Sequence, residues 1–132
     1  MKTRAGSVSA VSMLQIVAEC LGYHVAPAPF LGAVVASRAL AGTRHERLLA
    51  DIASGQCRVG IAFTEAVGAR ADGRVAFESG KLSGRALFVA DAGAHQYLVA
   101  TPEGQLCLVP ASEAQVTPIT TIDKTRAPAR SR

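Results

Sequence analysis

The sequence predicts an α+β fold in which N-terminal α-helices are followed by a small antiparallel β-barrel. Apolar residues recur at helical spacing through the first 55 residues. After Gly55 the period falls from about 3.6 to 2, and Gly, Asp, Pro and Ser separate a series of short apolar runs. Helices first and strands afterwards is the order of an α+β chain and not of a doubly wound one.

The first two predicted helices are separated by a proline-rich linker. The first covers 8–21, stops at Gly22 and has its apolar residues at helical spacing, namely Val11, Leu14, Val17 and Leu21. The segment 26–30 cannot continue a helix, because each of its two prolines removes a hydrogen-bond donor and restrains the preceding residue. An alanine-rich helix is then predicted over 31–40, ending at Gly42.

The third predicted helix has the clearest boundaries. Thr43 and Glu46 have the spacing of a T-x-x-E capping box, in which each side chain satisfies a free backbone amide of the other's turn. Its buried stripe comprises Leu48, Leu49 and Ile52. Gly55 ends the helix and the helical half of the chain.

The second half has the alternation of β-strands. Over 57–63, the residues Cys57, Val59, Ile61 and Phe63 alternate with Arg58, Gly60 and Ala62, which predicts a strand with one buried face. Further strands are predicted over 74–78, 85–90, 96–101, 105–110 and 115–122. The chain thus divides into a helical part (1–55), a β part (56–124) and a basic tail (125–132) that is predicted to be unstructured.

The composition favours a folded domain with an electrically neutral body. Of the 132 residues, 49% are hydrophobic and 18% charged, enough for the core of one modest domain or of a piece of a larger protein. The formal charge of +4 lies at the two ends, since residues 5–118 hold eight basic and nine acidic side chains. A nucleic-acid-binding face needs its Lys and Arg side chains on one surface, so no nucleic-acid partner is expected.

The cysteines and the N-terminal segment indicate a cytoplasmic protein. Cys20, Cys57 and Cys107 are scattered and odd in number, which is typical of buried thiols in a reducing compartment and not of disulfides or a zinc site. Gln15 and Glu19 interrupt the apolar run that a signal peptide needs. No stretch reaches the roughly 18 apolar residues of a membrane helix, so no membrane partner is expected.

General motif searches give no catalytic or metal-binding pattern. The chain has no G-x-G-x-x-G, and the pair Gly80 and Lys81 lacks the upstream spacing of a phosphate-binding loop. His24, His45 and His95 have no metal-ligating residue four positions on, so each is interpreted as a surface or capping histidine. Residue types and spacing alone therefore predict a helical segment joined to a small β domain, without a chemistry.

Short strings of residues in a fixed order carry more information. In the first half they are Glu19–Gly22, Ala26–Phe30, Leu49–Gly55 and Ile61–Glu65. In the second half they are Leu82–Arg85, Phe88–Ala92, Leu108–Pro110, Val116–Pro118 and Asp123–Arg126. Together they cover nearly the whole chain, which resembles the acyl-CoA dehydrogenase family. The resemblance implies part of that family's N-terminal helical domain over 1–55 and an incomplete middle β-barrel domain over 56–124.

The resemblance implies a flavoprotein of fatty acid metabolism, an oxidoreductase with FAD as cofactor. In the family a glutamate removes the α-proton of an acyl-CoA thioester while the β-hydrogen leaves as hydride to flavin N5. By resemblance, Thr64 meets the flavin ring near N5 and O4, Phe63 adds a backbone contact, and Phe88 packs its flat apolar face against the ring. Ala90 stands where many members have a flavin-contacting Thr, so one hydrogen bond of the family's site is expected to be missing.

The segment after Thr64 departs from the family's pattern. The family usually has Thr-Glu-Pro-Gly-x-Gly-Ser-Asp, whereas this chain has Thr-Glu-Ala-Val-Gly-Ala-Arg-Ala-Asp over 64–72. Without a gap, Arg70 replaces the serine expected to meet flavin phosphate or the acyl-CoA substrate; a one-residue gap would align Asp72 instead. An arginine can pair with a phosphate or CoA oxygen, so Arg70 is the candidate substrate-binding residue.

The resemblance also implies a C-terminal helical bundle that supplies the catalytic base in most members and would begin beyond Arg132. None of the candidate glutamates matches that base, namely Glu19, Glu46, Glu65, Glu78, Glu103 and Glu113. We therefore expect a fragment inactive alone, in a homo- or hetero-oligomer with a chain that supplies the bundle. Two alternatives stay open, a non-catalytic subunit or interaction module that pairs with such a chain, and an α+β domain without a ligand.

Overall fold

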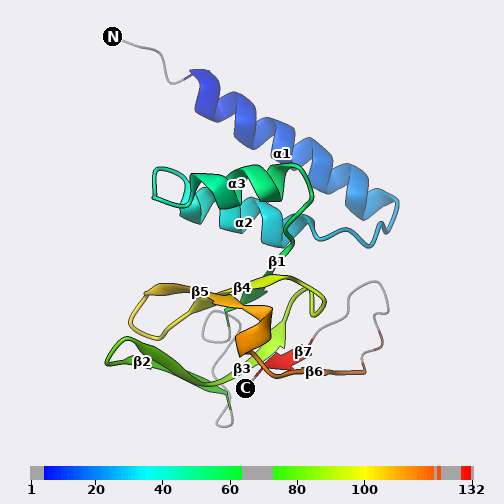
Figure 1. Ribbon diagram of the computed structural model, residues 1–132. Coiled ribbons are helices and arrows are strands. Elements are labelled where there is room, and N and C mark those ends of the chain that lie inside the picture. The colour runs from blue at the N-terminus through cyan, green and yellow to red at the C-terminus, as the bar shows by residue number, and fades with distance from the viewer. Residues whose placement is uncertain (1–4, 64–72, 121, 123–128, 132) are drawn as a thin grey trace.

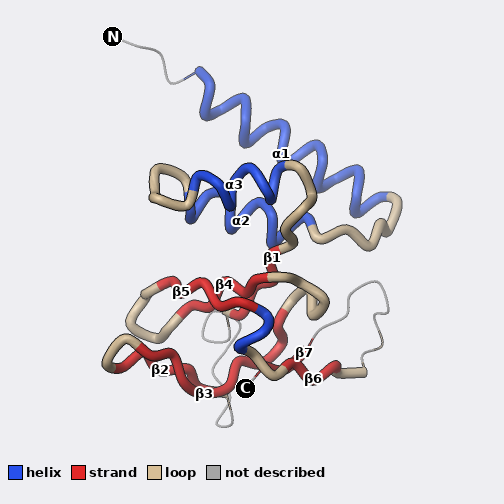
Figure 2. The backbone as a smooth tube through the Cα atoms, in the orientation of Figure 1, coloured by secondary structure: helices blue, strands red, loops and turns tan. Residues whose placement is uncertain are grey.

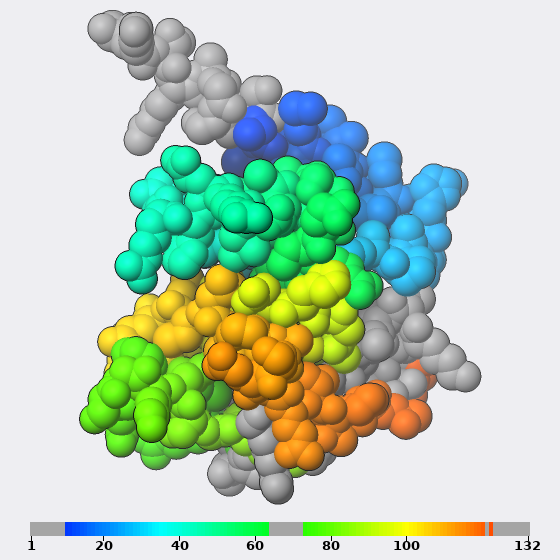
Figure 3. Space-filling model, viewed as in Figure 1, coloured from blue at the N-terminus to red at the C-terminus, as the bar shows by residue number. Residues whose placement is uncertain are grey.

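The chain forms a layer of helices next to a layer of strands. The computed structural model describes residues 5–63, 73–120, 122 and 129–131. Three helices come first and strands follow, which confirms the predicted α+β class. Figures 1 and 2 show the helices at one end of the molecule and the strands at the other, with β1 leading between them. In the space-filling view the two layers are in direct contact (Figure 3).

Helix α1 (Ala5–Tyr23) lies outermost in the helical layer. It extends beyond the predicted segment 8–21 at both ends, and Gly22 lies within its last turn instead of stopping it. Figure 1 shows α1 running obliquely past α2 and α3, with its N-terminal end pointing away from the sheets. All its side chains from Ala10 to Cys20 are exposed, so Cys20 is not the buried thiol that the sequence predicted. Within the described residues, no helix has the length and apolarity to cross a membrane.

Helices α2 (Phe30–Leu40) and α3 (Glu46–Ala53) agree closely with the predicted segments. They pack on each other and on β1, and their buried residues form a cluster with strand residues: Ala36, Leu40, Ile52, Val59 and Leu98. Leu48 and Leu49 are partly buried against this cluster, so the apolar stripe of α3 faces the core as predicted. The α2–α3 cluster, as we call it, joins the helical layer to β1.

The predicted capping box between Thr43 and Glu46 is wrong. His45, not Thr43, occupies the N-cap position of α3, and no side chain caps that end. The Thr43 hydroxyl instead donates a hydrogen bond of 2.7 Å to the carbonyl oxygen of Leu40 and accepts one of 3.3 Å from the backbone N–H of His45. Thr43 therefore closes the end of α2, because a hydroxyl can satisfy a free carbonyl at a helix C-terminus as readily as an amide at an N-terminus.

The described strands form two sheets. In chain order the strands are β1 (Val59–Ala62), β2 (Arg74–Glu78), β3 (Lys81–Val89), β4 (Gln96–Ala100), β5 (Leu106–Pro110), β6 (Val116–Pro118) and β7 (Ala129–Ser131). One sheet has the order β1-β4-β5 and the other β2-β3-β7-β6. Backbone hydrogen bonds of 2.9 and 3.2 Å between Ile61 and Ala90 connect the two sheets.

The sheets differ from the predicted antiparallel barrel in two respects. Strand β1 pairs with β4 in parallel, with Ile61 opposite Leu98, whereas the other described pairs are antiparallel. The described strands also do not close into a barrel. Parallel pairing needs a long connection, which the chain provides because the β2–β3 hairpin lies between β1 and β4.

Strand β1 is buried on both faces, although its alternation predicted one buried face. Val59 belongs to the α2–α3 cluster on one side, and Ala62 to a second core between the sheets on the other. A Cβ added to Gly60 would lie 2.7 Å from the carbonyl oxygen of Ala90 and 2.8 Å from the Tyr97 ring. Gly60 and Ala62 are therefore the small residues of a crowded interior and not those of a solvent-facing side.

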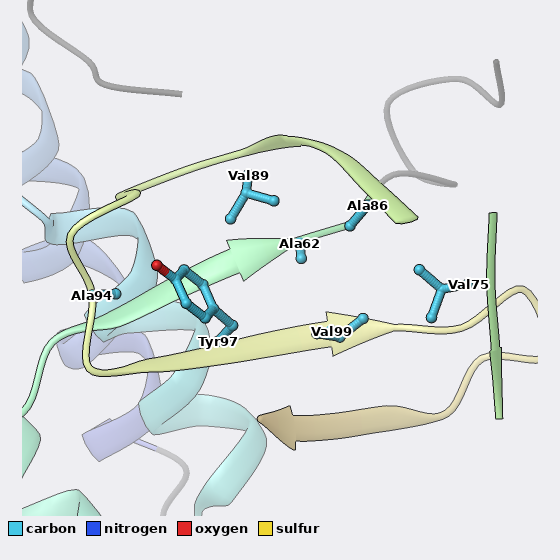
Figure 4. Packing of buried hydrophobic residues seen from close by; sticks show 7 residues of the cluster. All are labelled: Ala62, Val75, Ala86, Val89, Ala94, Tyr97 and Val99. Atoms are coloured by element: carbon cyan, nitrogen blue, oxygen red, sulfur yellow. The ribbon is translucent and has the colours of Figure 1, made fainter. Parts of the chain in front are cut away.

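The core between the sheets consists mostly of small side chains. Its buried residues, shown in Figure 4, are Ala62, Val75, Ala86, Val89, Ala94, Tyr97 and Val99. Tyr97 is the one aromatic member, and Val89 is completely buried. In Figure 4 the Tyr97 ring, from β4, extends across the space between β1 and the segment that follows β3. With such small side chains, close approach of the strands determines the packing.

The prediction of an unstructured tail over 125–132 is wrong in part. Ala129–Ser131 form β7, which pairs with both β3 and β6. The described part of the tail therefore belongs to the sheet, and residues 125–128 and 132 lie outside the described part. The predicted strand over 115–122 is shorter in the structure, since β6 covers Val116–Pro118.

We expect Gly32→Ala to destabilise the protein strongly. A Cβ at Gly32 would lie 1.8 Å from the carbonyl oxygen of Val59, so α2 would have to move away from β1. Overpacking of this kind costs about 1–3 kcal/mol or more in the free energy of unfolding. Urea denaturation followed by circular dichroism measures the loss. Gly22→Ala, in α1 with open space around it, is the matched control and should leave the stability unchanged or raise it.

Candidate functional site

A hollow of about 750 Å³ lies where the helical layer meets the end of β3. Its walls are the last turn of α1, the proline-rich linker over 25–29, the first turn of α2 and the turn over 90–94 that follows β3. This volume is within the range of small-molecule sites, roughly 300–1,000 Å³. We call it the linker hollow.

The structure brings two of the five predicted site residues together. Phe88 and Ala90 both line the linker hollow, and the Phe88 side chain is 47% exposed. Phe63 does not line this hollow, because its partly buried side chain packs against the α2–α3 cluster. Thr64 and Arg70 lie outside the described residues.

An irregularity in β3 explains why Phe88 is exposed within an otherwise buried stretch. The register between β3 and β7 shifts between Ala86 and Val89, and Phe88 has a φ of +55°. Leu87 and Val89, on either side, are buried. A bulge turns a side chain away from the face that regular alternation would give it. Phe88 thereby presents its ring to the hollow and not to the core.

Backbone strain is concentrated around the linker hollow. Val25, Phe88 and Asp91 have φ values of +49°, +55° and +60°, a region that non-glycine residues seldom adopt, and all three line the hollow. The other described non-glycine residue with positive φ, Ser79, lies in the β2–β3 turn. Strain of about 1–3 kcal/mol per residue persists only where the surrounding fold enforces it, and such residues cluster at ligand sites.

Two charged residues of the hollow were not predicted from the sequence. Arg58 lines it from the position just before β1, and Asp91 from the turn after β3. The backbone of Arg58 is fixed, since its N–H donates to Nδ1 of His95 at 3.0 Å and its carbonyl oxygen accepts from the backbone N–H of His95 at 2.9 Å. The exposed side chain of Arg58 therefore extends from a backbone that is fixed in position. The signal in the sequence that could have pointed to Arg58 was a polar residue next to a buried strand.

The Asp91 carboxylate lies at the first turn of α2. An added Cβ on Gly32 would be 3.4 Å from its Oδ2 atom, which places the carboxylate beside the third residue of that helix. The N-terminal end of a helix carries a partial positive charge and stabilises an anion. Asp91 therefore fastens the turn after β3 to α2, and the hollow is enclosed between these two elements.

Tyr97 stabilises the same turn, over 90–94. Its hydroxyl donates a 2.5 Å hydrogen bond to the carbonyl oxygen of Ala92, and burial raises the pKa of the phenol. The backbone N–H of Ala94 also donates to the carbonyl oxygen of Asp91, at 3.0 Å. The turn that carries Ala90 and Asp91 is thus connected directly to the core between the sheets.

A second hollow, of about 450 Å³, lies between the β2–β3 hairpin and β5. None of the predicted site residues lines it. Burial raises the pKa of the Cys107 thiol at its edge, and burial together with the Asp51 carboxylate raises that of Cys57 elsewhere, which disfavours the reactive thiolate. In the described part of the chain, no three His, Cys, Asp or Glu side chains come together as metal ligands.

Comparison with known proteins gives one distant structural neighbour. No protein-family model and no curated protein matches the chain. Among solved structures, the chain is similar to a nitrososynthase from Micromonospora carbonacea var. africana, with 24% sequence identity and a TM-score of 0.44. The similarity covers 65% of this chain and 22% of the neighbour's, so this chain spans about a fifth of that protein. A likeness of this size does not identify a family.

We expect Phe88→Gly to raise the free energy of unfolding by about 1 kcal/mol. Glycine adopts a positive φ without strain, and the half-exposed ring contributes little burial. Phe77→Gly is the matched control: Phe77 is similarly exposed and lies in β2, without a positive φ, so its replacement should destabilise the protein. Urea midpoints compare the two variants. A loss of stability in Phe88→Gly would contradict strain at this position.

We expect Tyr97→Phe to lower the stability by about 1 kcal/mol at neutral pH, because the carbonyl oxygen of Ala92 loses its donor. Above pH 10, the ordinary phenol value, the unfolded chain releases the Tyr97 proton before the folded one does, so the wild-type loses stability as pH rises. The Tyr97→Phe variant should not show the loss of stability that the phenol causes. It should still show the loss that the raised pKa values of the Cys57 and Cys107 thiols cause. Denaturation between pH 7 and 11 tests this, with the exposed Tyr23→Phe as control.

Proposed function

We propose that this chain is the flavin-binding part of an oxidoreductase of the acyl-CoA dehydrogenase type, and that the linker hollow receives the flavin ring. The observation that carries the proposal is the exposure of Phe88, turned into the hollow by the β3 bulge beside Ala90. The sequence resemblance assigned the flavin-packing ring to this residue. The bulge turns the Phe88 ring into the linker hollow, whereas regular alternation would have turned it into the core.

The residues of the hollow suit a flavin in three ways. The Phe88 ring offers a flat apolar surface on which an aromatic ring system can stack. Arg58 carries a positive charge near enough to the hollow to pair with a phosphate. The strained turns at Val25 and Asp91 hold the walls in a fixed arrangement before any ligand enters.

FAD, when bound, would supply the hydride acceptor at N5, and the chain's own residues would bind and orient it. Phe88 and Ala90 would exclude water from one side of the ring, while Thr64, by resemblance, would donate hydrogen bonds to its N5 and O4 edge. Arg70 is proposed, on the same ground, to contact acyl-CoA. No residue of this chain is proposed as the catalytic base, which would come from a chain that supplies the helical bundle.

A second candidate function is that of a non-catalytic subunit or interaction module. The observation in its favour is the exposed apolar surface of α1, where Met13, Ile16 and Val17 face solvent. Apolar side chains gathered on one outer helix are typical of a surface that a partner covers. The two functions differ in one measurable property, since the module has no need of flavin.

Flavin binding separates the two functions. We expect the purified chain to retain a perturbed flavin absorption band after incubation with FAD and desalting. Phe88→Ala should weaken FAD binding about tenfold, because stacking and apolar contact are worth roughly 1–2 kcal/mol. Phe77→Ala, which removes a similarly exposed ring outside the linker hollow, should bind FAD as the wild-type does. A colourless, soluble wild-type chain would contradict flavin binding by this chain and favour the interaction module.

A further inference from the structure

Helix α1 has two apolar rows that differ in exposure. The row formed by Leu14, Val17 and Leu21 is the less exposed, at 38% for Leu14 and 43% for Val17, and Leu21 lines the linker hollow. The second row, which we call the outer row, consists of Met13, Ile16, Cys20 and Tyr23. Met13 is 65% and Ile16 61% exposed, and Cys20 and Tyr23 are exposed as well.

The spacing of the outer row is that of a helix-pairing seam. Its members are separated by three, four and three residues, which keeps them on one narrow strip along α1. Apolar residues alternating three and four apart are the pattern by which two helices pack side by side. The strip is exposed along α1, which lies at the outside of the helical layer (Figure 1), so a second helix can approach it.

We propose that the outer row is a dimerisation surface whose occupant is α1 of a second copy of this chain, in parallel orientation. In that arrangement each outer-row residue meets its own counterpart, as a twofold axis along the helix pair requires. The helical pair would be about 28 Å long. The sheets of the two copies would lie on opposite sides of the pair, because each α1 has its own sheets behind it (Figures 1 and 3).

The charges on α1 favour a second copy in this orientation. Glu19 is the one charged residue of Ala5–Tyr23, and it flanks the outer row, so two copies meet with almost no like-charge repulsion. In a parallel pair, a flanking residue lies near the residue five positions on in the other helix, which for Glu19 is His24. An antiparallel pair would instead bring the two Glu19 carboxylates toward each other.

The helical turn at the end of α1 continues to His24. The backbone N–H of His24 donates a 3.1 Å hydrogen bond to the carbonyl oxygen of Cys20, so His24 continues the helical turn. Its ring lies edge-on to that of Tyr23, with the centroids 5.1 Å apart. In the proposed dimer, the His24 imidazole donates a hydrogen bond to Glu19 of the second copy. This dimer does not depend on flavin binding.

Sedimentation equilibrium of the full chain tests the proposal. We expect a dimer for the wild-type and a rise of more than about tenfold in its dissociation constant for Ile16→Glu, which places a carboxylate in the seam. Val11→Glu is the matched control, since Val11 is comparably exposed but lies about 140° around the helix from Ile16. It introduces the same charge in the same helix and should leave the dimer intact.

Cysteine cross-linking tests the orientation. In a parallel pair the two Cys20 thiols face each other, so mild oxidation should give a disulfide-linked dimer that Cys20→Ser abolishes and that Cys57→Ser and Cys107→Ser do not. A monomeric wild-type, or a dimer equally sensitive to Val11→Glu, would overturn the proposed surface. A dimer that Ile16→Glu dissociates but that forms no Cys20 cross-link would overturn the parallel orientation.

Discussion

Close packing around β1 is the constraint on which the rest of the structure depends. The strand lies between α2 and the core of the two sheets, and a glycine removes the obstructing Cβ on each side: Gly32 faces the Val59 carbonyl oxygen, and Gly60 faces Tyr97 and Ala90. Because both contacts involve backbone, neither can relax by a change of side-chain rotamer. The helical layer, the parallel pair with β4 and the bridge to β3 all meet at β1.

The linker hollow is a consequence of that packing. The Ile61–Ala90 bridge fixes where β3 ends, and the chain must then turn within the few residues before β4. The positive φ of Asp91 lies in this turn, which Tyr97 and the first turn of α2 hold in place, while the positive φ of Phe88 belongs to the irregularity of β3 just before it. The stability of the core thus maintains a strained wall, and the strain exposes the ring on which the proposed flavin site depends.

Helix α1 differs from the closely packed region around β1. It is connected to α2 by the proline-rich linker, and its side chains pack little against the chain's own core. The same linker and the last turn of α1 line the hollow, so a partner on α1 would lie beside the proposed flavin site. The proposed dimer and the proposed flavin site are therefore neighbours that can be tested separately.

Local pattern determined much of the fold. Helical spacing and prolines gave the bounds of α2 and α3 closely, and the resemblance assigned Phe88 and Ala90 to a site whose function is still a proposal. Tertiary contacts decided the rest. Burial on both sides made β1 non-alternating, the Leu40 carbonyl took the Thr43 hydroxyl, and a parallel partner came from a strand more than thirty residues away. The hollow itself, with Arg58 and Asp91, exists only because distant segments converge, since periodicity records which face of an element is apolar but not what will cover it.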